Sequence, residues 1–172
     1  VFSDPALTGW DGFGIAVQAY QKRASKVIDW LAALARKYER RATIRLVKGA
    51  YWDTEIKRAQ ERGLPGYPVF TRKAMTDLHY ESCARQMLAL RPHIYPQFAT
   101  HNALTVATVL AMVGNSGGFE FQRLHGMGEA LYEKLLADNE QLACRVYAPI
   151  GAHADLLAYL VRRLLENGAN SS

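Results

Sequence analysis

Two basic side chains, Arg45 and Lys48, occur in a segment that otherwise has the composition of a buried strand. Residues 43–47 are rich in β-branched and apolar side chains, and Gly49 follows Lys48. A guanidinium is costly to bury unless it is paired or fully hydrogen-bonded. The segment therefore predicts an anionic or strongly accepting ligand beside Arg45, which Gly49 would let the backbone approach closely. The alternative is an edge strand with Arg45 solvated on its outer face.

A second candidate for ligand binding is His101, between Thr100 and Asn102. A helix is expected to begin at Ala103, and helix N-termini offer N–H groups to anions. These neighbours favour an anion site. The alternative is that His101 is only a hydrogen-bonded structural group.

A third candidate is the pair Arg162 and Arg163, with Glu166 one helical turn later. Two guanidiniums can hold a substrate carboxylate by charge-assisted hydrogen bonds, and Tyr147 on the preceding strand could pack beside them. The alternative is a solvated ion-pair cluster on the helix surface, because Glu166 is at the i+4 and i+3 spacings from the two arginines.

Other chemistries have weaker support in the sequence. The five histidines form no HExxH arrangement, no CxxC is present, and no nucleophile elbow occurs, so we predict neither a metal site nor covalent catalysis. Cys83 and Cys144 lie in apolar stretches and are predicted to be buried free thiols. The candidate groups are fixed cations, which suit an anionic substrate and a charged cofactor that supplies the chemistry.

The composition is that of a globular protein. The chain has 172 residues, of which 49% are hydrophobic and 22% charged, with a net charge of +5. Scattered basic residues without a reader motif give little support to nucleic-acid binding, and no apolar run is long enough to span a membrane. The chain starts at Val1 without methionine, so both ends are interpreted as cuts in a longer protein.

Strands and helices are predicted to alternate along the whole chain. Strands are expected at 13–20, 43–49, 94–100, 119–124 and 143–148, and helices at 24–38, 52–61, 71–89, 103–113, 129–138 and 154–167, the last ending at Gly168. This alternation predicts a parallel sheet with helices outside it. A doubly wound sheet and a (βα)8 barrel both fit, although no strand is followed by a dinucleotide-binding glycine fingerprint. Polar groups at several strand ends are what a barrel active site needs: Gln18, Lys48, Thr100, His101, Asn102, His125 and Tyr147.

Several of these segments closely resemble the proline dehydrogenase domain of the bacterial bifunctional proline utilisation A flavoenzymes. The resemblance is carried, almost from end to end and in order, by VQAYQKR (17–23), RLVKGAYWD (45–53), YPQFATHN (95–102), EFQ (120–122), LHGMG (124–128) and YLVRRLLENGAN (159–170). It implies an α/β fold, a TIM-like (βα)8 barrel, of which residues 1–172 would be an incomplete C-terminal portion of about five βα units, from strand four to helix eight.

The resemblance also implies an activity and a cofactor. The protein would use FAD to oxidise L-proline to Δ1-pyrroline-5-carboxylate, with hydride passing to flavin N(5) and electrons passing on to a quinone. This is the first step of proline catabolism to glutamate, and the motifs favour a parent that also carries an L-glutamate γ-semialdehyde dehydrogenase.

Site residues follow from the same resemblance. Arg45 would lie near flavin N(5) and stabilise the reduced ring, while Arg162 and Arg163 would bind the proline carboxylate. The proline pocket would be shaped by Tyr147, Leu46 and Tyr51, with Glu166 supporting the arginines or the cofactor. The expected FAD contacts are Gln18, Arg45, Lys48, Gly49, Ala50, Trp52, Thr71, Lys73, Thr100, His101, Gln122, Leu124 and Glu166.

The resemblance has limits in this chain. A substrate-contacting lysine and an active-site aspartate of the family would lie before Val1, and the loop at 114–118 is shorter than in the family. The expected location is cytoplasmic. A homodimer, association with the inner membrane and DNA binding through parts of the parent outside this chain are left open.

Two other functions remain as alternatives. One is a barrel lyase or aldolase that uses Lys48 to hold a phosphate, which predicts no flavin colour. The other is a non-catalytic fragment that binds a partner through its open sheet edges and is not stabilised by a ligand.

Overall fold

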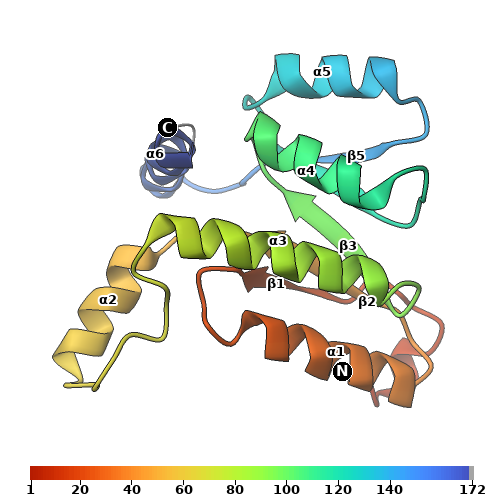
Figure 1. Cartoon of the computed structure of the whole chain (residues 1–172), viewed down its shortest axis with the longest axis horizontal. Helices are drawn as coiled ribbons and strands as arrows, with labels where there is room; N and C mark the ends of the chain where they lie inside the picture. The colour runs from red at the N-terminus through yellow and green to blue at the C-terminus, as the bar shows by residue number, and fades with distance from the viewer. Residues whose placement is uncertain (171–172) are drawn as a thin grey trace. The chain divides into compact units, whose positions relative to one another are not determined.

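The structure, a computed structural model, describes residues 1–170, except for the side chains of His153, Asp155 and residues 166–170. Helices and strands alternate as the sequence predicts (Figure 1). The strands are β1 (Gly14–Gln18), β2 (Ala42–Val47), β3 (Ile94–Ala99), β4 (Glu120–Leu124) and β5 (Ala143–Tyr147). The α-helices are α1 (Ala24–Lys37), α2 (Trp52–Glu61), α3 (Lys73–Ala89), α4 (Ala103–Val113), α5 (Glu129–Asp138) and α6 (His153–Asn170).

Two local features differ from the prediction. A short 3-10 helix, η1 (Pro5–Leu7), was not expected; the side chain of Asp4 caps it by accepting a 3.0 Å hydrogen bond from Ala6 N. The expected end of the last helix at Gly168 is wrong, because α6 continues to Asn170. A glycine inside a helix costs about 1 kcal/mol relative to alanine, which does not by itself end a helix.

The strand order decides between the two predicted architectures. The five strands form one sheet in the order β1-β2-β3-β4-β5, and the printed pairs β1–β2, β2–β3 and β4–β5 are parallel. A doubly wound sheet reverses its strand order at a switch point, whereas strands of a (βα)8 barrel follow one another in chain order. The observed order therefore agrees with a partial barrel.

The chain divides into two compact units, of which the first comprises Val1–Phe98. Helices α1 and α3 pack against each other and both contact β2 (Figure 1). The Gln86 side chain joins the two helices by accepting from Ser25 Oγ at 2.9 Å and donating to Asp29 Oδ1 at 2.6 Å. The core of this unit is apolar and includes Ile28, Leu31, Ile44, Leu46, Cys83 and Met87.

The second unit begins at Ala99. Phe121 of β4 packs edge-to-face on Tyr132 of α5, with ring centroids 6.1 Å apart, so this face of β4 is the one that α5 covers. Strand β5 is largely exposed, as are Leu157, Leu164 and Leu165 of α6. Among the described residues, none of the helices is long and apolar enough to cross a membrane.

The two cysteines lie in different environments. Both are free thiols, and Cys83 is fully buried, which raises its pKa to about 11. The prediction that Cys144 is buried is wrong: Cys144 is only half-buried, because it lies on the exposed strand β5. Partial burial still raises the pKa of Cys144.

Candidate functional site

Lys48 lies just beyond the carboxyl end of β2 and is held by a carboxylate from α3. Its Nζ is 2.6 Å from Oδ1 of Asp77, and the Lys48 side chain is only 17% exposed. A cation fixed at the carboxyl end of a parallel strand is in the position where (βα)8 barrels bind their ligands. The sequence predicts a role for Lys48 but none for Asp77, because no short spacing connects residue 48 with residue 77.

Beside Lys48, the backbone of Gly49 and Ala50 passes very close to the side chains of Tyr20 and Gln18. Gly49 has a φ of 149°, and a Cβ at this position would lie 2.5 Å from the ring of Tyr20, so no larger residue fits without movement. Ala50 N donates a 3.0 Å hydrogen bond to Oε1 of Gln18, at the end of β1. Three of the predicted cofactor residues are therefore brought together here: Gln18, Gly49 and Ala50.

Arg45 lies in the interior of the sheet. Strand β2 pairs with β1 on one side and with β3 on the other, so the alternative of an edge strand is wrong. Arg45 is half-buried, whereas Ile44 and Leu46 are fully buried. Because side chains alternate along a strand, Leu46 points to the face opposite Arg45, the face with the buried core residues.

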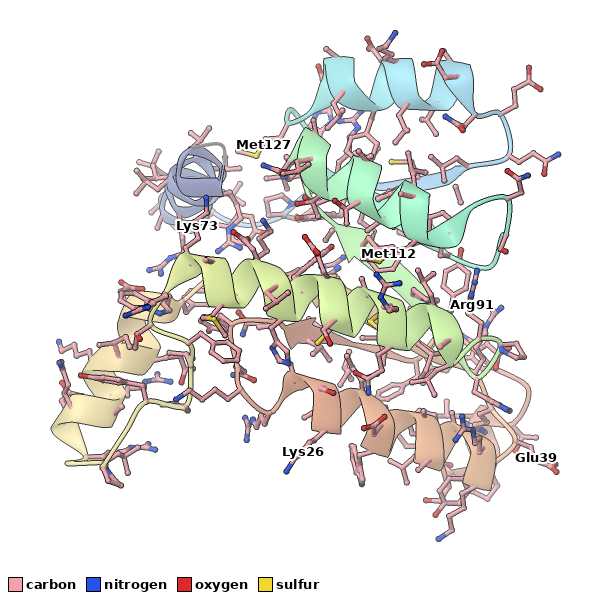
Figure 2. The ribbon with its side chains drawn as sticks, viewed as in Figure 1. Lys26, Glu39, Lys73, Arg91, Met112 and Met127 are labelled. Atoms are coloured by element: carbon pink, nitrogen blue, oxygen red, sulfur yellow. The ribbon has the colours of Figure 1, made fainter. Side chains whose placement is uncertain are left out.

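Four further predicted site residues lie at or shortly before the first residues of α2 and α3. Tyr51 and Trp52 are 43% and 45% exposed, and the Trp52 indole N–H donates a 2.8 Å hydrogen bond to the carbonyl of Phe70. Thr71 comes directly after Phe70, and Lys73 begins α3 (Figure 2). Trp52 therefore fixes the segment that carries Thr71 and Lys73.

Thr100 and His101 connect β3 to α4 in the second unit. Thr100 N donates to the carbonyl of Gln122 at 3.3 Å, and Tyr132 Oη donates to the carbonyl of Thr100 at 2.8 Å. His101 Nε2 accepts a 3.0 Å hydrogen bond from Leu124 N. The structure thus brings four of the predicted cofactor residues together: Thr100, His101, Gln122 and Leu124.

The hydrogen bond that His101 Nε2 accepts determines the tautomer of the neutral imidazole ring. A nitrogen that accepts a bond carries no proton, so in the neutral ring the proton is on Nδ1. The predicted structural role of His101 is therefore confirmed at Nε2. The predicted anion-binding role belongs to the Nδ1–H side of the same ring and stays a prediction.

Asn102 begins α4. Its Oδ1 accepts from Thr105 N at 2.9 Å and from Thr105 Oγ1 at 3.1 Å. This N-cap holds the first turn of α4 in place directly after His101.

Gln122 belongs to a buried polar group that the sequence analysis missed. Its Nε2 donates to Oε1 of Glu120 at 2.7 Å, and Arg145 of β5 holds the same carboxylate. The available signal was the alternation of polar and apolar residues at 120–122, but the partner on β5 becomes evident only from the strand register.

The predicted substrate-binding arginines lie on α6. Arg162 and Arg163 are both half-buried, and the guanidinium carbon of Arg163 is 5.1 Å from the ring centroid of Tyr159. Tyr147, at the end of β5, is half-buried, and its carbonyl accepts from His125 N at 2.8 Å. The side chain of Glu166 lies outside the described residues.

The chain matches one protein-family model along its whole length. That model is described as proline dehydrogenase and matches residues 1–172. The chain belongs to the proline dehydrogenase family. The resemblance identified from the motifs is therefore confirmed.

Individual proteins agree with this membership of the proline dehydrogenase family. The chain is 58% identical over 176 residues to the bifunctional protein PutA of Salmonella typhimurium, a match that covers 98% of this chain and 13% of that protein. The crystal structure of a Bradyrhizobium japonicum Proline Utilization A mutant is 76% identical, with a TM-score of 0.91, and the match covers 98% of this chain and 17% of that one.

A more distant relative has the same fold. The crystal structure of proline utilization A from Bdellovibrio bacteriovorus, inactivated by N-propargylglycine, is 40% identical, with a TM-score of 0.86 over 95% of this chain and 17% of that chain. This proline dehydrogenase chain thus spans less than a fifth of the length of each of these relatives.

Proposed function

We propose that this chain is part of the proline dehydrogenase site of a bifunctional proline utilisation A enzyme, which oxidises L-proline to Δ1-pyrroline-5-carboxylate with FAD. The observation that carries the proposal is the match to the proline dehydrogenase family over all 172 residues. Polar and cationic side chains at strand ends, where a barrel binds its ligands, support it. The family match gives no support to the alternative of a lyase or aldolase.

The residues present fit FAD. The ammonium of Lys48, the close backbone approach at Gly49 and the Nδ1–H side of His101 suit the anionic pyrophosphate of the cofactor. Bound FAD would supply the two-electron acceptor for oxidation of the carbon next to the proline nitrogen. The other proposed cofactor contacts are Gln18, Arg45, Ala50, Trp52, Thr71, Lys73, Thr100, Gln122, Leu124 and Glu166.

The protein side chains would supply charge and orientation. Arg45 would stabilise negative charge on the cofactor ring, because a fixed guanidinium in a shielded site costs no reorganisation when charge develops. Arg162 and Arg163 would hold the substrate carboxylate. Tyr51, Tyr147 and Leu46 would shape the pocket around the proline ring; Leu46 would do so through packing, since it lies on the buried face of β2.

Further properties of the whole protein belong to the same proposal. Electrons would leave through a quinone acceptor, which would bring the protein to the inner face of the cytoplasmic membrane. A homodimer and DNA binding would depend on parts of the protein outside this chain.

The deciding experiment is anaerobic reduction of the flavin in the full-length protein. L-Proline should bleach the oxidised flavin absorbance, whereas succinate should leave it unchanged. A protein that binds no flavin, or whose flavin is reduced equally by succinate, would overturn the proposed function. The same measurement on residues 1–172 alone tests the non-catalytic alternative, which predicts no flavin binding by this chain.

A further inference from the structure

The turn that follows β1 is held by a side chain of α3, His79. In a regular strand, successive N–H groups point to opposite sides, but Ala19 N and Tyr20 N both donate to the same neighbouring segment. Their acceptors are the carbonyls of Val47 and Lys48, each at 2.8 Å. Regular strand geometry therefore ends at Ala19. Because Ala19 is fully buried, its carbonyl needs a donor from within the protein, and Nδ1 of His79 lies 2.7 Å from it.

The two contacts of the His79 ring determine where its proton lies. A carbonyl oxygen can only accept, so Nδ1 carries the proton that is donated to Ala19. In the neutral ring Nε2 is then an acceptor, and it lies 3.7 Å from Sγ of Cys83. Burial raises the pKa of Cys83 to about 11, so near neutral pH the thiol keeps its proton and can donate to Nε2. Cys83 therefore favours the tautomer that bonds to Ala19.

The His79 ring also contacts the segment that precedes α3. It packs edge-to-face on Phe70, with ring centroids 5.2 Å apart. Phe70 N donates to the carbonyl of Tyr20 at 2.8 Å, and the carbonyl of Phe70 accepts from the indole N–H of Trp52. His79 thus contacts both the turn after β1 and the residue that joins this turn to α2.

This turn supports the backbone that follows β2. On one side of Ala19, Gln18 Oε1 accepts a 3.0 Å hydrogen bond from Ala50 N. On the other side, the ring of Tyr20 is so close to Gly49 that an added Cβ would lie 2.5 Å from it. A shift of the Ala19 peptide would therefore move both residues that support this backbone.

We propose that His79 is a positioning residue for the bound flavin cofactor: by donating to the carbonyl of Ala19, it holds the turn after β1 in the conformation that supports the cofactor-binding backbone at 48–50. This proposal rests on the proposed function, in which residues 48–50 contact FAD. His79 itself does not need to touch the cofactor or the substrate. Its contribution is one hydrogen bond that fixes the backbone before the cofactor binds.

Three substitutions of His79 in the full-length protein separate the hydrogen bond from the volume of the ring, with the dissociation constant of FAD as the readout. His79→Leu removes the donor, and FAD should bind about tenfold more weakly, the effect of losing one hydrogen bond. His79→Gln should have a similar effect, because its amide nitrogen is one bond farther from the backbone than Nδ1. His79→Asn places an amide nitrogen at nearly the position of Nδ1, so it should bind FAD within about threefold of the unmodified protein.

The matched control is His93→Leu, the same substitution at another histidine of the first unit. His93 is half-buried and directly precedes β3, at the amino end of the sheet, where its carbonyl accepts from Ala42 N at 2.9 Å. The cofactor is proposed to bind at the carboxyl ends of the strands, so this variant should leave FAD affinity unchanged.

Unchanged FAD affinity in His79→Leu or in His79→Gln would overturn the proposal. Equal weakening in His79→Asn and His79→Gln would also overturn it, because loss of the ring rather than of the hydrogen bond would then be responsible. If His79→Leu fails to fold, the comparison of the two polar variants decides by itself. Failure of the proposed function is distinguishable from these results, since the unmodified full-length protein would then bind no FAD.

Discussion

The two units hold their candidate site residues by different kinds of interaction. In the first unit, Lys48 is held by the charge of Asp77, with both side chains partly accessible to water. In the second, Thr100 and His101 are held by neutral hydrogen bonds with Tyr132 Oη and with the backbone N–H of Leu124. Salt screens partly exposed charges, whereas buried neutral hydrogen bonds are insensitive to it. One fold can therefore hold site residues both by a salt-sensitive charge pair and by salt-insensitive hydrogen bonds.

The largest effect is expected from adding a side chain at Gly49 in the first unit, where the backbone passes close to the ring of Tyr20. In Gly49→Ala the new Cβ would meet the ring of Tyr20 at 2.5 Å, at a φ of 149° that favours glycine. We expect the full-length protein to lose most of its bound flavin, as measured by the ratio of flavin to protein absorbance. Gly66→Ala is the control, since no atom lies within 4 Å of its added Cβ. Normal flavin content in Gly49→Ala would show that the cofactor does not need this approach.

The next effect tests α6 in the second unit. Arg163→Met should raise the KM for proline roughly ten- to hundredfold, since a hydrogen bond to a charged group contributes roughly 1.5–3 kcal/mol. Steady-state kinetics over a wide range of proline concentration measure the change. Arg36→Met, on the exposed surface of α1, is the matched control. An unchanged KM would remove Arg163 from the substrate site.

A smaller effect is expected at the neutral hydrogen bonds. Tyr132→Phe removes the donor to the Thr100 carbonyl from a tyrosine that is 1% exposed. The loss should destabilise the second unit by about 1–3 kcal/mol and lower the temperature at which the flavin is released. This shift in the flavin-release temperature should be the same at low and high salt. The control is Tyr38→Phe, at a half-buried tyrosine of the first unit, which should leave the flavin-release temperature unchanged. A shift that disappears in salt would contradict the comparison between the units.

The smallest effect is expected at the charge pair. Asp77→Asn should change the flavin-release temperature by the equivalent of about 1 kcal/mol or less, because a partly exposed ion pair contributes little. Unlike the effect of Tyr132→Phe, this one should shrink as NaCl is raised from low concentration to about 1 M. Lys57→Met, which removes the exposed pair with Glu61, serves as the control. Equal effects at both salt concentrations would show that the Lys48–Asp77 pair is shielded from solvent.

Local patterns were sufficient to predict the β-strands and the α-helices. The strand at 43–49 and the helix at 103–113 followed from periodicity and β-branched residues; α4 confirms the helix, and β2 confirms the strand, although β2 ends at Val47. The polar residues at the strand ends also came from local sequence. Spacing alone left two architectures open, which the strand order separated.

The partners of the site residues could not be predicted in this way. Asp77 reaches Lys48 from 29 positions along the chain, and Arg145 reaches Glu120 from 25 positions. Such pairs depend on how a helix returns to its strand and on the register of two strands, neither of which is encoded in short spacings. Cys144 shows the same limit, because an apolar neighbourhood in sequence did not reveal that β5 is exposed.

The pairing of β1, β2 and β3 in chain order has a consequence for synthesis on the ribosome. Strands β2 and β3 each emerge after a strand with which they pair, so neither has to wait for a distant segment before its ladder can begin. Early pairing of this kind can begin during synthesis, when N-terminal parts of a protein generally fold first. A pause in translation would therefore be expected to do least harm once a strand and the helix that follows it have both left the exit tunnel.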